Sequence, residues 1–199
     1  MIAGALMGLL TMALHPRGAD DVIRAPLHAF AMMSMPIAFY GALILTRRLS
    51  AQGTFAELAL VFYGAAMFAG VIAATASGLL LSELAAKAGT LEGPTRTMFN
   101  SLMWYNIHLN EVFAKVMVGA SCVAIGLWSV DILRTRLLRR SVALFGCITS
   151  VVLFGLLLSG WLEMSIHGFG SVVLLQGIWM ILIGVELRAA TIPFKPATE

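Results

Sequence analysis

The chain has 199 residues, of which 60% are hydrophobic and 12% are charged, and its formal net charge is +3. Soluble proteins average about half apolar and about a quarter charged residues, so this composition excludes an ordinary soluble domain and indicates a polytopic membrane protein. The basic residues lie in short segments between apolar runs, as membrane orientation requires, and we therefore expect no nucleic-acid partner. Residues 1–199 are interpreted as a single transmembrane helical domain in the lipid bilayer.

Apolar runs follow one another along the chain, and most are long enough to cross a bilayer as helices. They cover residues 2–14, 24–46, 54–86, 99–130, 141–163 and 167–187. The first run is short for a full crossing. Turn-forming residues separate the runs, notably at 15–18, 51–53 and 89–94. We expect an all-α membrane helix bundle of about six transmembrane helices, arranged as three αα-hairpins.

The two ends of this bundle differ in charge and in histidine content. All four histidines fall where the first helix ends or the even-numbered helices begin, and we call this side the histidine face. The opposite side, the basic face, carries Arg47, Arg48, Arg134, Arg136, Arg139, Arg140, Arg188 and Lys195. The positive-inside tendency then predicts a multi-pass inner-membrane protein with both termini in the cytoplasm and the histidine face directed outward to the periplasm.

Three histidines open the even-numbered helices and should lie at one depth: His28, His108 and His167. Ionisable groups at membrane depth are costly and usually point into the bundle, so we expect them to share a site, with His15 as a further member. Glu111 follows His108 at i+3, the spacing by which bundle proteins present two metal ligands from one helix. An alternative interpretation is that the imidazoles only anchor helix ends at the head groups.

The expected ligand set suits a transition metal or a haem. Imidazole and carboxylate groups bind copper, iron or zinc, and two facing imidazoles would hold haem b. Methionines accompany the histidines, since Met35 follows His28 at i+7, Met12 precedes His15 by one turn and Met164 precedes His167. Thioethers with imidazoles favour copper(I), although methionine is more usually pliable core filler.

Further polar residues complete the predicted site. Glu111 and Lys115 share one face of the fourth helix at i, i+4, where they could pair and act as a proton or charge relay. Tyr105, Asn106 and Glu163 are candidates to orient the ligands from behind.

The pattern of residues leads to one principal hypothesis and two alternatives. The principal one is a histidine-lined metal or haem site serving redox chemistry, metal handling or metal-assisted chemistry on a membrane substrate such as quinone. One alternative is a transporter or channel component with His108, Glu111 and Lys115 along a polar pathway. The other is a non-catalytic accessory or assembly subunit, which would join a membrane complex or a homo-oligomer. Whether the protein is an enzyme stays open, since motifs for nucleotide hydrolysis, zincin proteolysis and serine hydrolysis are missing.

Overall fold

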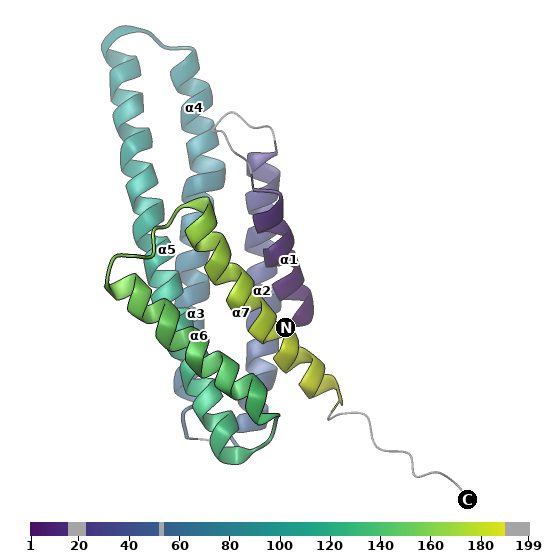
Figure 1. Ribbon diagram of the computed structural model, residues 1–199. Coiled ribbons are helices and arrows are strands. Elements are labelled where there is room, and N and C mark those ends of the chain that lie inside the picture. The colour runs from purple at the N-terminus through teal and green to yellow at the C-terminus, as the bar shows by residue number, and fades with distance from the viewer. Residues whose placement is uncertain (16–22, 52–53, 190–199) are drawn as a thin grey trace, which may run out of the picture.

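The computed structural model describes residues 1–15, 23–51 and 54–189, and these form α-helices with one π-helical segment (Figure 1). In chain order the elements are α1 (Ile2–Ala13), α2 (Arg24–Leu49), α3 (Ala56–Ala74), η1 (Thr75–Leu80), α4 (Leu81–Gly89), α5 (Gly93–Thr135), α6 (Arg140–Leu158) and α7 (Ile166–Ala189). The predicted turns at 16–18 and 52–53, and Lys195, lie outside the described residues.

The predicted all-α membrane bundle is confirmed. Five helical stretches are long and apolar enough to cross a membrane, with α3, η1 and α4 forming one continuous stretch, Ala56–Gly89. The first helix, α1, has 12 residues and is shorter than such a span. Large apolar side chains such as Phe68, Val151 and Leu158 are exposed on the outer surface. A bilayer surrounding the bundle would cover these side chains.

The helices pack as two close hairpins and a looser third pair. Helix α1 lies against α2, and α3 lies along α5, whereas the main partners of α6 and α7 are α5 and α1. Small residues permit the first contact, because a β-carbon on Gly4 would come 2.7 Å from the backbone nitrogen of Ala38. Helix α7 packs against α1, and this contact joins the last helix of the bundle to the first.

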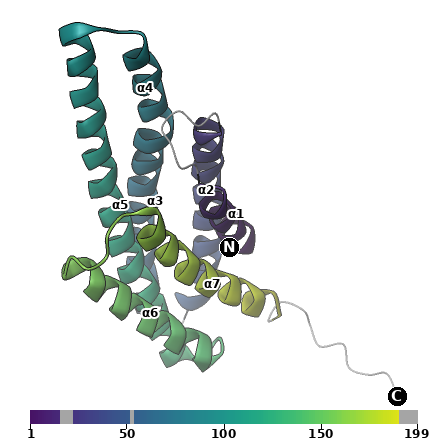
Figure 2. The ribbon, with the colours of Figure 1, turned by 45° about the horizontal axis from the view of Figure 1, so that its top comes forward.

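The hairpin of α4 and α5 projects beyond the ends of the other helices, as Figures 1 and 2 show. The sequence predicted that one helix ends at residue 86 and that the next begins at residue 99. In the structure, α4 continues to Gly89 and α5 already begins at Gly93. Pro94 occupies the first turn of α5, where its missing N–H costs no hydrogen bond. The connection falls at the predicted turn residues, but it is shorter than the gap between the two apolar runs.

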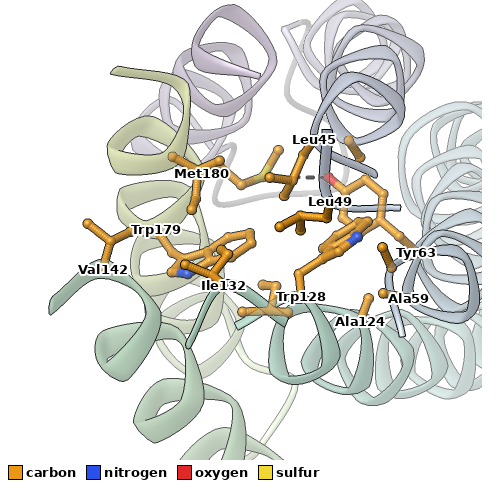
Figure 3. Close-up of a cluster of buried hydrophobic side chains, with 14 of the residues drawn as sticks. Leu45, Leu49, Ala59, Tyr63, Ala124, Trp128, Ile132, Val142, Trp179 and Met180 are labelled. Carbon is orange, nitrogen blue, oxygen red and sulfur yellow. Dashed lines mark hydrogen bonds between the residues drawn. The ribbon is translucent and has the colours of Figure 1, made fainter. Parts of the chain in front are cut away.

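Aromatic side chains fill the half of the bundle toward the basic face (Figure 3). Trp128 and Trp179 are fully buried and stack with ring centroids 6.3 Å apart, and Tyr63 lies 5.3 Å from Trp128. Leu45 and Leu49 of α2 pack beside them. We call this cluster the aromatic core. Within it, the indole N–H of Trp128 donates a hydrogen bond to the Thr46 hydroxyl at 3.1 Å.

A buried carboxylate ties α5 to the start of α3. Asp131 is inaccessible to solvent, and its two oxygens accept hydrogen bonds from the backbone N–H groups of Thr54 (3.2 Å) and Phe55 (2.8 Å). These groups precede α3, whose first N–H groups lack partners within the helix. Asp131 therefore acts as an N-terminal cap supplied by another helix, and negative charge at that position is favourable.

Candidate functional site

A cavity of about 440 Å³ occupies the half of the bundle toward the histidine face. Residues of α1, α2, α3, η1, α5 and α7 line it, and we call it the central cavity. Tyr63 and Met180 belong both to its lining and to the aromatic core, so they form the boundary between the two. Its size and mostly apolar lining are those of sites for small molecules.

The π-helical turn η1 shapes the polar end of this cavity. Carbonyl oxygens of two consecutive η1 residues accept side-chain hydrogen bonds, Ala76 from Asn106 Nδ2 at 2.7 Å and Ser77 from Arg24 Nη1 at 2.9 Å. Such turns are rare and occur often at functional sites. Three helices thus deliver polar groups to one place, and both donor side chains are buried.

His28 is buried at this end of the cavity. Its Nδ1 lies 2.8 Å from the carbonyl oxygen of Arg24, which can only accept, so in the neutral ring Nδ1 carries the proton and Nε2 keeps a lone pair. The ring lies against Gly78, where any β-carbon would collide with it. The His15 ring meets it edge-on with centroids 5.4 Å apart. The structure therefore brings two of the predicted histidines together.

The other predicted ligands lie elsewhere. His108 is exposed on α5, where its Nδ1 is 3.5 Å from Glu111 and its ring packs on Trp104 with centroids 4.4 Å apart. His167 is exposed in the first turn of α7. Across residues 1–15, 23–51 and 54–189, no three histidine, cysteine, aspartate or glutamate side chains approach closely enough to hold a metal ion. The four-residue site of His28, His108, His167 and Glu111 is not assembled.

The predicted haem fits poorly as well. An axial pair must stand on opposite sides of a porphyrin, whereas His15 and His28 touch each other and leave no gap for one. His108 and His167 are exposed on the surface of the bundle, so they cannot face each other across its interior.

The predicted relay lies in a second hollow, between α5 and the loop joining α6 to α7. Glu111, Lys115 and Glu163 line it, and none of them lines the central cavity. Among the described ion pairs, Glu111 faces His108 and not Lys115, so the expected i, i+4 pair is not formed. The described residues that line this hollow come from α5, α6 and the loop that follows α6, and the pathway hypothesis stays a prediction.

Of the residues predicted to orient ligands, Asn106 alone reaches the central cavity. It is 3% exposed, and its Oδ1 has no hydrogen-bond partner in the described part of the chain. Tyr105, its neighbour, is 68% exposed, and Glu163 is exposed in the α6–α7 loop.

Half of the chain's twelve methionines line the central cavity. They are Met12, Met35, Met67, Met117, Met164 and Met180. The sequence indicated methionine close to His15, His28 and His167, but Met67 and Met117 enter from helices that showed no such pattern. Flexible thioethers suit a cavity that must adapt to its contents.

The sequence analysis did not single out Arg24, and it did not predict the π-helix. The signal available for Arg24 was its position four residues before His28, one turn away on the same face. No protein-family model, curated protein or solved structure matches this chain.

Proposed function

We propose that this membrane protein binds a lipid-soluble hydroxyl compound of the quinol class in its central cavity, with the hydroxyl head at His28 and Asn106. The observation that carries the proposal is a pair of unengaged acceptors at the polar end. The Nε2 of neutral His28 has no hydrogen bond within the described residues. The Oδ1 of Asn106, which the surrounding residues enclose, has none either, and a ligand would reach it after a small movement of this side chain. A ligand that complements two acceptors must donate, as a hydroxyl does.

The remainder of the cavity suits an apolar ring or chain. Beyond the polar end its walls are made by methionine side chains and by small residues such as Ala31, Ala73 and Ala74. Ligand sites typically combine such apolar walls with a few polar groups that fix orientation. A quinol has this division, since its hydroxyls are polar and its substituents are apolar.

Binding of duroquinol to the purified full-length protein in detergent, measured by equilibrium dialysis, tests the proposal. We expect His28→Ala to weaken binding by about tenfold or more, the equivalent of one hydrogen bond. His108→Ala is the matched control, because this histidine lies outside the cavity and its loss should leave binding unchanged.

The dimethyl ether of the same hydroquinone is the matched control ligand, since it keeps the ring and lacks donor hydrogens. It should bind at least about tenfold more weakly than duroquinol. Equal binding of the ether, or an equal loss of affinity in His28→Ala and His108→Ala, would contradict the proposed head-group site.

A second candidate is a transition-metal ion held by His15 and His28 in place of the four predicted ligands. The ring centroids of the two histidines lie 5.4 Å apart, which favours this candidate. The hydrogen bond of His28 Nδ1 to a backbone carbonyl oxygen also favours it, because metal-binding histidines typically make such a bond. Copper, iron and zinc measured in the purified protein should fall in His28→Ala and stay constant in His108→Ala if this candidate holds.

We also propose that the protein resides in the inner membrane with its basic face in the cytoplasm. Arg47, Arg48, Arg134 and Arg188 at helix ends support this orientation through the positive-inside tendency. In a background without Cys122 and Cys147, Thr90→Cys should react with a membrane-impermeant maleimide in intact cells, whereas Leu137→Cys should react only after lysis. The reverse labelling would invert the proposed orientation.

A further inference from the structure

Two methionine sulfurs converge inside the central cavity, where α2, α3 and α5 meet. The sulfur of Met117 lies 2.9 Å, and that of Met35 lies 3.2 Å, from the point where a β-carbon on Gly70 would stand. Gly70 is buried, and only the missing side chain leaves room for both thioethers. Met67, one turn before Gly70 on α3, lines the same cavity.

Two methionine sulfurs near this place have a hydrogen-bond donor among the described residues. Met180 accepts a contact from the Tyr63 hydroxyl at 3.5 Å, and Met32 accepts one from Thr75 at 3.3 Å. No described hydrogen bond engages Met35 or Met117. Their sulfur lone pairs are therefore available to another partner.

We propose that Met35 and Met117 form a copper(I) site over Gly70. Thioethers are soft ligands, and soft ligands select copper(I) over the harder divalent metals. The site is distinct from the histidine pair, since Met35 stands seven residues after His28, or about 10 Å along α2. It does not depend on the quinol proposed above, because its ligands are different side chains.

The charge of the surroundings permits a monovalent cation at this place. Arg24, the cation that lines the cavity, precedes Met35 by eleven residues, which is about 16 Å along the helix. Neutral thioethers bind without releasing protons, so the affinity should be nearly independent of pH between 6 and 8 as an approximate range, unlike that of an imidazole site.

Titration of the purified full-length protein with copper(I), using bicinchoninate as competitor under a reductant, tests this site. We expect one copper(I) per chain, and a loss of affinity of about tenfold or more in both Met35→Leu and Met117→Leu. Leucine conserves the volume of methionine, so both variants should fold. Met33→Leu is the matched control, because Met33 lies on the same helix but is 63% exposed on its outer side.

Gly70→Ala provides a second test that keeps every sulfur. Its β-carbon would push the flexible ends of Met35 and Met117 apart, and copper(I) affinity should fall although no ligand is removed. Wild-type affinity in Met35→Leu and Met117→Leu, or an equal loss in Met33→Leu, would overturn the site. Copper(I) titration and duroquinol dialysis are separate measurements on different side chains, so failure of this inference and failure of the quinol site give different results.

Discussion

The two halves of the bundle are built from the same helices but are packed differently. Toward the basic face, α2, α3, α5 and α7 bury tryptophans and leucines with nothing between them (Figure 3). Toward the histidine face, the same four helices and α1 line the central cavity, and six methionines are among the residues of its wall. Tyr63 stands at the boundary, with its ring on Trp128 and its hydroxyl on the Met180 sulfur.

The two halves of the bundle should therefore have different roles: the aromatic core should determine the stability of the fold, and the central cavity should determine ligand binding. A close-packed base holds the helices at fixed spacing, because interiors at crystal-like density resist rearrangement. The outer half then keeps an adaptable volume without loss of the fold. Substitutions in the aromatic core should therefore affect unfolding, whereas substitutions around the cavity should affect ligands.

The largest expected effect is that of Trp128→Ala. Removing this fully buried ring leaves a cavity in the aromatic core, and the free energy of unfolding should fall by about 3–5 kcal/mol. Denaturant titration in detergent, followed by circular dichroism, measures the change. Trp161→Ala is the control, since this residue is 82% exposed in the α6–α7 loop, and a comparable loss there would remove the distinction between core and surface.

Asp131→Ala should have the next largest effect. It leaves the N–H groups of Thr54 and Phe55 without their acceptor, and we expect a loss of about 2 kcal/mol in the same titration. Asp131→Asn keeps one oxygen and should lose less. If alanine and asparagine were equivalent to the wild type, the cap at the start of α3 would carry no stability.

Enlarging an alanine compares the two halves directly. Ala124→Leu inserts carbon atoms into the aromatic core and should destabilise the fold by about 1–3 kcal/mol. Ala73→Leu makes the same change in the cavity wall, where space exists, so stability should change little while duroquinol binding falls. Equal destabilisation in both variants would show that the cavity is no more accommodating than the core.

Asn106→Ala should have a small effect on stability. It breaks one buried hydrogen bond to the Ala76 carbonyl but also removes the unpartnered Oδ1, so the net loss should be about 1 kcal/mol or less. Duroquinol affinity should fall with it. Asn100→Ala, an exposed asparagine on the same helix, should change neither quantity.

The positions of the helices could be predicted from the sequence, because runs of apolar residues bounded by charges and turn residues are unambiguous. The rotation of each helix about its own axis could not be predicted. Each helix is apolar nearly all round, so the pattern does not tell which face meets lipid and which meets protein. His28 and His108 were both expected to open their helices, but α5 begins at Gly93, so His108 lies well inside its helix; it is exposed, whereas His28, near the start of α2, is buried.

The convergence of Met35 and Met117 was also beyond prediction, since it depends on three helices meeting at Gly70. The π-helical turn at Thr75–Leu80 has no marker in its residues that ordinary helix propensity would detect. In the structure, two of its carbonyl oxygens accept hydrogen bonds from Asn106 and Arg24. The extent of most helices could therefore be predicted, whereas the neighbours of each side chain could not.

The projecting hairpin of α4 and α5 offers a practical use. Its tip, at residues 90–92, stands clear of the other helices in both views (Figures 1 and 2) and is separated from the cavity by several helical turns. A soluble domain inserted there would be joined to the protein by two regular helices and not by a flexible linker. That rigid connection would give a small membrane protein the fiducial it needs for image alignment in electron cryomicroscopy, with its binding chamber left intact.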